Sequence, residues 1–152
     1  MRFVSPRDYA TIIRMNKEII NTNVDAPVII YKMNLQETET NIYGEAKDNI
    51  KRRYVGVAVP CLWNREDSET DVDKGAVDIT QKGKFSFLRQ ELIDRDIYPQ
   101  MGDIIEADGQ YYEIDVANEI QLHAGQSAFN FSVSCDVHLA RKISVQLDRP
   151  II

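Results

Sequence analysis

The spacing of apolar positions predicts one helix at the start of the chain. Ser5 can cap residues 5–21, Pro6 suits the first helical position, and Asp8 follows three residues after the cap. Four apolar side chains then fall roughly on one face, at Tyr9, Ile12, Ile13 and Ile20. The polar run 21–23 favours turns, so we expect the helix to end there.

Beyond the helix the apolar period changes to two, which is the period of a β-strand. Residues 28–35 and 54–63 therefore predict two strands, each with one buried side. The shared faces are Ile29, Tyr31, Met33 and Leu35 in the first strand, and Val55, Val57, Val59, Cys61 and Trp63 in the second. Pro60 cannot donate a ladder hydrogen bond, which places the second strand at a sheet edge or at a bulge.

The clearest strand is 129–139, where apolar and polar residues alternate without a break. A hairpin is predicted around Asp108-Gly109, with strands at 104–107 and 111–116, the second burying Tyr112, Ile114 and Val116 on one face. Shorter elements are expected at 77–80, around Phe85 and Phe87, at 89–96 as a helical turn, at 98–103 as a turn, and at 143–147. Six or seven strands after one helix predict a mainly β fold, an antiparallel β-barrel or sandwich.

We expect a single domain over residues 1–152, with a β-core of 26–148 interrupted by an acidic loop at 64–75. The acidic side chains of this loop are Glu66, Asp67, Glu69, Asp71 and Asp73. A calcium-binding EF-hand needs glycine at its sixth position, and counting from Asp67 that position is Val72. A solvated loop is therefore favoured over a loose surface cation site.

Composition and charge narrow the function classes. The chain has 152 residues and no apolar run long enough for a membrane helix, and its polar start excludes a signal peptide, so we expect a cytoplasmic product. The net charge of −6 argues against a dedicated nucleic-acid binder, which would need clustered Lys and Arg. The densest basic cluster, 51–53, is interpreted as a solvated turn.

Candidate catalytic groups are few. Cys135 and His138 are three apart on a strand and point to opposite faces, while Cys61 and Cys135 lie on apolar faces as core thiols. Glu113 and Asp115 share a face, either as an acid–base pair or as the solvent or channel face of a strand. Common catalytic motifs are absent from the sequence. We therefore expect no enzyme, no metal and no cofactor.

Several short strings, taken in order, resemble one known family. They are residues 15–21, 28–32, 41–45, 84–89, 98–103, 111–115 and Gln121. Their order and spacing over residues 15–141 resemble the neck proteins of contractile-tailed phages of the T-even type, although this chain is shorter.

The resemblance implies a structural virion protein of the phage neck, assembled in the host cytoplasm. It would form a head-closure or connector ring, typically of six copies with twelve as the alternative, between a portal or adaptor ring and a tail-terminator ring. Genomic DNA would pass through its channel, and no membrane would be involved.

Some residues fit that expectation independently. Trp63, Tyr98 and Tyr111 are candidate interface aromatics, with packing inside their own chain as the alternative. Acidic residues such as Glu113 and Asp115 could line a channel and repel phosphate, and the 64–75 loop could order on docking. The competing interpretations are a tail-terminator or other tail ring, a soluble β-barrel ligand-binding module, and a hydrolase using Glu113 and Asp115.

Overall fold

The computed structural model describes residues 5–24, 26–33, 55–66, 69–73, 76–122 and 130–140, and confirms a mainly β fold with an N-terminal helix. Its helices are α1 (Pro6–Glu18), the π-helix η1 (Ile19–Val24) and α2 (Arg89–Asp94). The strands are β1 (Pro27–Tyr31), β2 (Val57–Pro60), β3 (Leu62–Arg65), β4 (Glu69–Asp73), β5 (Ala76–Thr80), β6 (Lys82–Leu88), β7 (Ile104–Ala107), β8 (Gln110–Gln121) and β9 (Asn130–Leu139). The strand predicted at 143–147 lies outside the described residues.

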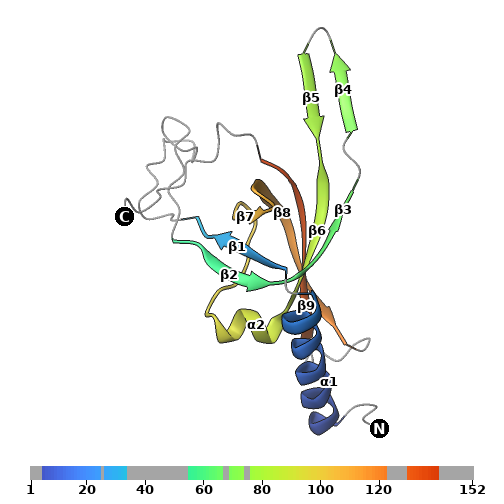
Figure 1. Cartoon of the computed structure of the whole chain (residues 1–152), viewed down its shortest axis with the longest axis vertical. Helices are drawn as coiled ribbons and strands as arrows, with labels where there is room; N and C mark the ends of the chain where they lie inside the picture. Colours follow the sequence, from blue (N-terminus) through green and yellow to red (C-terminus); the bar gives the residue numbers. More distant parts are fainter. Residues whose placement is uncertain are drawn as a thin grey trace.

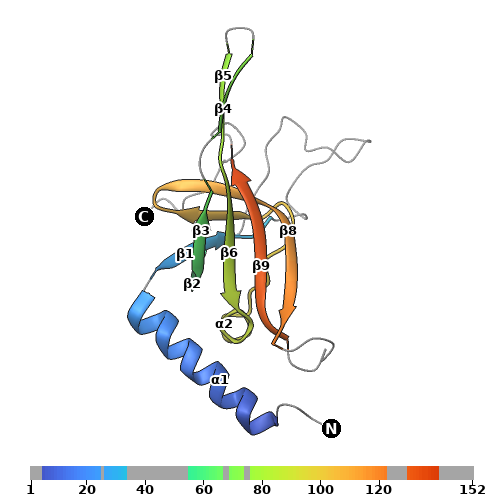
Figure 2. The same cartoon turned by 90° about the vertical axis from the view of Figure 1, so that its right-hand side faces the viewer.

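Seven strands form one antiparallel sheet in the order β2-β1-β7-β8-β9-β6-β3. Its two edge strands, β2 and β3, are neighbours in the chain with only Cys61 between them. The sheet therefore curls into an open barrel whose edges join end to end at Cys61 (Figures 1 and 2). The single strand predicted at 54–63 is wrong in this respect, because its first half pairs with β1 and its second half with β6.

The core fills the inside of this curled sheet. Phe85 stacks on Trp63 with ring centroids 5.3 Å apart, and Tyr112 meets Phe85 edge-on at 5.8 Å. Cys61 and Cys135 are both buried in the same cluster, which confirms them as core thiols. Aromatic rings and thiols thus occupy the centre of the domain.

The buried face of β1 differs from the prediction. Val28 and Ile30 are buried, while Ile29 and Tyr31 are half-buried. This strand lies between β2 and β7 and is apolar on both sides, so alternation alone could not identify its inner face. The edge position expected from Pro60 is confirmed, because Pro60 ends the β1–β2 ladder opposite Pro27.

The turn predicted at Asp108-Gly109 is confirmed in the hairpin formed by β7 and β8. Asp108 and Gly109 both have positive φ, at 50° and 72°, as a type I′ turn requires. Further along β8 the register shifts between Ile114 and Val116, leaving Asp115 as an extra, bulged residue. The bulge turns Val116 outward, so the expected buried face of Tyr112, Ile114 and Val116 stops at Ile114.

The acidic loop predicted at 64–75 is wrong. Residues 62–65, 69–73 and 76–80 are strands, and β4 pairs with β5 in a separate two-stranded sheet that projects from the barrel (Figures 1 and 2). Three residues separate Arg65 from Glu69, whereas two separate Thr80 from Gly83, so the register slips by one between barrel and hairpin. The β4–β5 hairpin is an extension of the β3–β6 pair.

The N-terminal helix begins as predicted and ends later. Ser5 Oγ accepts a hydrogen bond from the Asp8 backbone N–H at 3.2 Å, and Asp8 Oδ2 accepts one from the Ser5 N–H at 3.2 Å. The polar run 21–23 continues the helix within η1, because Asn21 uses its side chain for a tertiary hydrogen bond to Glu91. None of the helices in the described segments is long and apolar enough to span a membrane.

Candidate functional site

Polar side chains gather at one end of the barrel, where α1, α2, the end of β8 and the start of β9 meet (Figures 1 and 2). The centre of this group is Glu91 on α2, whose side chain is 0% exposed. Lys17 Nζ lies 3.2 Å from Glu91 Oε1, and Asn21 Nδ2 donates to the same oxygen at 3.2 Å. Arg95 donates to Glu91 Oε2. One carboxylate therefore joins α2 to both α1 and η1.

The charge on Glu91 is maintained by its partners. Burial by itself raises the pKa of the Glu91 carboxyl, but the hydrogen bonds from Arg95, Asn21 and Lys17 outweigh burial, so the pKa lies below its ordinary value of 4.5. Beside it, Lys17 Nζ also pairs with Asp94 Oδ2 at 2.5 Å, which lowers the pKa of Asp94 and raises that of Lys17. The group is an ion-pair network at neutral pH.

A second carboxylate, Glu119 at the end of β8, binds the neighbouring segments together. Tyr98 Oη donates to Glu119 Oε1 at 2.9 Å, and Asn130 Nδ2 donates to Glu119 Oε2. Arg89 Nε lies 3.5 Å from Glu119 Oε1, an ion-pair distance without hydrogen-bond geometry. The Asn130 carbonyl in turn accepts a hydrogen bond from Tyr9 Oη on α1 at 2.6 Å. The helix is thus tied to the barrel at two places.

A shallow hollow of about 250 Å³ opens next to these groups. Its lining residues are Arg89, Leu92, Ile93, Asp96, Ile97 and Tyr98. Leu92 and Ile97 are buried, while Ile93 and Tyr98 are largely exposed. The hollow offers an apolar base with charged groups beside it.

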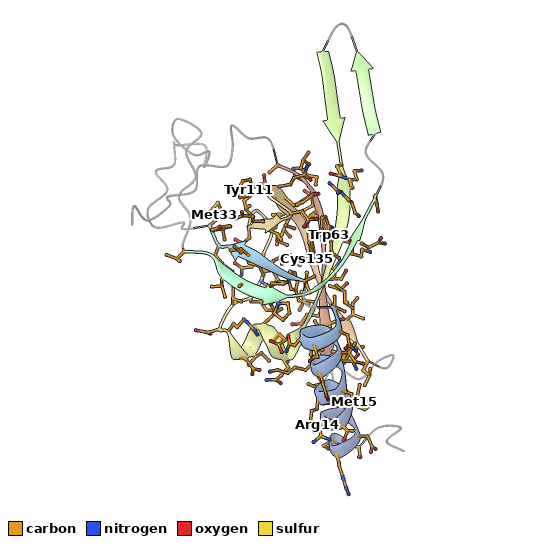
Figure 3. The ribbon with its side chains drawn as sticks, in the orientation of Figure 1. Arg14, Met15, Met33, Trp63, Tyr111 and Cys135 are labelled. Carbon is orange, nitrogen blue, oxygen red and sulfur yellow. The ribbon has the colours of Figure 1, made fainter. Side chains whose placement is uncertain are left out.

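The three predicted interface aromatics lie on different parts of the molecule. Trp63 is half-buried, stacked on Phe85 and covered by the Arg65 guanidinium at 5.5 Å from its ring centroid. Tyr111 is half-buried on β8, opposite Glu106 of β7, and Figure 3 labels it apart from Trp63. Tyr98 alone belongs to the polar group at the α1–α2 end. These residues therefore do not form one surface.

Glu113 and Asp115 both lie next to His138 on the outer face of the sheet. Glu113 is the cross-strand partner of His138, and His138 Nδ1 is 2.7 Å from Asp115 Oδ1. His138 is thus paired with a carboxylate of the neighbouring strand. Because Asp115 and His138 are both well exposed, their pair is an ordinary surface contact.

The predicted acidic residues now have positions in a hairpin. Its register pairs Thr70 with Ile79, Val72 with Val77 and Asp71 with Asp78. In this register, alternate positions hold Thr70, Val72, Val77 and Ile79 in one row and Glu69, Asp71, Asp73, Ala76, Asp78 and Thr80 in the other, and we call them the apolar row and the acidic row. Asp67 lies outside the described residues. Within the described segments, no three His, Cys, Asp or Glu residues are placed to hold a metal ion.

Sequence reasoning missed Lys17, Glu91 and Glu119. The one local signal was the spacing of Glu91 and Arg95, which is i to i+4 and suits an ion pair on a helix. Nothing near Glu91 in the sequence indicates burial, because two of its three partners, Lys17 and Asn21, come from α1 and η1. No protein-family model matches the chain, and no curated protein sequence matches it.

Proposed function

We propose that the chain is a structural subunit of a phage neck ring, which joins the portal-bearing head to the tail and lets genomic DNA pass. The observation that carries this proposal is the projecting β4–β5 hairpin. A two-stranded hairpin is at best marginally stable in water by itself. Asp71 is also the register partner of Asp78, and like-charged residues at directly opposite positions disfavour a hairpin. Such an element favours a protein whose neighbours cover it.

The two faces of the hairpin suit a position in a ring. Its apolar row can bury against a neighbouring subunit, and its acidic row can remain hydrated. Residues 66–80 carry six carboxylates and one lysine, which is most of the excess behind the net charge of −6. An acidic surface along a channel repels phosphate, so DNA would slide through without being held.

The shape of the subunit also suits head-to-tail association. The hairpin and α1 project from opposite ends of the barrel (Figures 1 and 2), so each subunit presents two unlike surfaces. Contacts between unlike surfaces of identical copies generate rings when the rotation closes. Six copies are the favoured number and twelve the alternative. A portal or adaptor ring and a tail-terminator ring are the proposed neighbours, and the proposed role is structural and not enzymatic.

Two other functions are also compatible with this arrangement of barrel and hairpin. A tail-terminator or other tail ring would use the same hairpin in the same way. A ligand-binding β-barrel module is favoured by the hollow beside α2, but its volume of about 250 Å³ lies at the small end for a ligand pocket. The neck ring accounts for the hairpin, which a monomeric binding module would leave uncovered.

The test is the native mass of the full chain, measured by light scattering over a range of concentrations. We expect a discrete species of six or twelve copies. Val77→Asp, in the apolar row, should reduce it to monomers, whereas Asp78→Asn, the next residue on the same strand, should leave it intact. The proposal fails if the wild type stays monomeric and does not add to isolated portal-bearing heads, or if Val77→Asp assembles as well as the wild type.

A further inference from the structure

The α1–η1 arm, residues 6–24, is held to its barrel with little apolar burial. No residue of α1 is buried, and in η1 only Ile20 is. Met15 and Ile19 are 56% and 47% exposed, and Figure 3 shows Arg14 and Met15 on the helix that projects from the barrel. Tyr9, Ile12 and Ile13 are only half-buried, so the packed apolar face that gives most helices in proteins their stability is weak in this arm.

Polar contacts add to this weak apolar attachment. Lys17 pairs with Glu91 and Asp94, Asn21 donates to Glu91, and Tyr9 donates to the Asn130 carbonyl. We call Glu91, Asp94 and the Asn130 carbonyl the Glu91 seat. If the arm leaves, Arg95 at the C-cap of α2 still pairs with Glu91, so the charge of Glu91 remains compensated. The arm can therefore separate from the seat without stranding a buried charge.

The part of the arm that lies next to the barrel has an unusual backbone conformation. η1 is a π-helix of six residues, a conformation that is rare at this length. It leads within a few residues to Pro27 at the start of β1, where proline fixes the backbone on the barrel side. A change confined to η1 would redirect the whole of α1 and leave β1 in register.

We propose that α1–η1 is an exchangeable arm, which in the assembled protein occupies the Glu91 seat of a second copy. The seat is complementary to Tyr9, Lys17 and Asn21, and every copy of the chain carries these three residues. An exchanged arm repeats the same contacts between subunits, so the assembly gains a link without a new surface. The inference rests on the proposed function only in requiring an assembly of several copies.

Charge reversal on separate chains tests the exchange. Lys17→Glu reverses the charge on the arm and leaves the seat unchanged. Glu91→Lys reverses the charge in the seat and leaves the arm unchanged. Each variant alone should need about tenfold more protein to assemble, as for one lost ionic hydrogen bond. A 1:1 mixture should recover wild-type assembly in sedimentation velocity, because alternating copies restore opposite charges at every junction. The double variant in one chain is the control and should assemble by itself.

The outcomes separate this inference from the ring. If the double variant assembles and the mixture does not recover, each arm stays on its own barrel and the exchange is wrong, whether or not rings form. A wild-type dimer that shows the same recovery would support the exchange and reject the ring. A wild type that is monomeric at every concentration would reject the exchange, and it would reject the ring as well if it also fails to add to isolated portal-bearing heads.

A second pair of variants covers the case in which Glu91→Lys does not fold. Asp94 is partly exposed, so the fold should tolerate the substitution Asp94→Arg. This variant can then be mixed with Lys17→Asp. Recovery in that mixture supports the exchange. Failure of the mixture, with assembly of the corresponding double variant, contradicts it.

Discussion

Glu91 is completely enclosed, yet side chains from α1, η1 and α2 all donate to its carboxylate. Asp94, one helical turn further on, shares Lys17 with it but remains partly exposed. An ion pair in solvent contributes little to stability, whereas a buried carboxylate without partners is costly. The same lysine therefore matters far more to Glu91 than to Asp94.

Glu91→Gln should lower the free energy of unfolding by about 1–3 kcal/mol. The glutamine amide has one accepting oxygen where the carboxylate has two, so at least one of the donors around it loses its acceptor. Asp94→Asn is the matched control and should change stability much less. Urea unfolding at neutral pH measures both. Equal losses in the two variants would contradict the central position given to Glu91.

For single residues, the sequence predicts the burial of apolar side chains well and the burial of charged side chains poorly. Alternation placed Cys61 and Cys135 in the core correctly, since an apolar residue on an apolar face needs no further partner. Glu91 lies in the segment 89–96, for which the sequence predicts only a helical turn. Its burial depends on Lys17 and Asn21, about seventy residues away in the chain, and no local pattern indicates that.

Elements that depend on local chemistry were predicted well. The cap of α1, the Asp108-Gly109 turn and the long alternation of β9 each follow from neighbouring residues. The β4–β5 hairpin was missed because its alternation is between acidic and small or apolar residues, which resembles a polar loop. The split at Cys61 was missed because the pairing of each half depends on distant strands.

Ser5→Ala should loosen α1 selectively. The capping hydrogen bond is worth about 1 kcal/mol to a helix, and α1 has little packing to compensate for its loss. We expect faster hydrogen exchange at α1 amides and unchanged exchange in β8 and β9. Thr11→Ala, on the exposed side of the same helix, is the control and should not accelerate exchange. Equally accelerated exchange in β8 and β9 of Ser5→Ala would be inconsistent with a weakly attached arm.

For the whole molecule, the buried thiols predict how stability depends on alkaline pH. Burial raises the pKa of Cys61 and of Cys135 from 9.0 to about 12. The folded state therefore keeps both protons more tightly than the unfolded state. Their contribution is complete below pH 9.0 and is lost as the pH rises toward about 12.

Unfolding free energies measured from pH 8 to 11 should therefore decline. In a variant with both cysteines replaced by alanine, overall stability will be lower but the decline should be shallower, because of the described groups with raised pKa only Lys17, Tyr98 and Tyr112 then remain. The slope of the unfolding free energy against pH reports the titration of the thiols, whereas the cavities left by the two alanines lower the free energy at every pH. Identical slopes would show that the thiols do not titrate with unfolding.

The junction of β2 and β3 at Cys61 also affects how safely many copies can coexist before they assemble. Free strand edges act as templates for aggregation, since their unpaired N–H and C=O groups accept stray strands. Here both edge strands of the barrel have four residues and meet end to end, so neither offers a long template. The projecting β4–β5 hairpin offers strand edges too, and the acidic residues along it disfavour edge-to-edge pairing of identical copies.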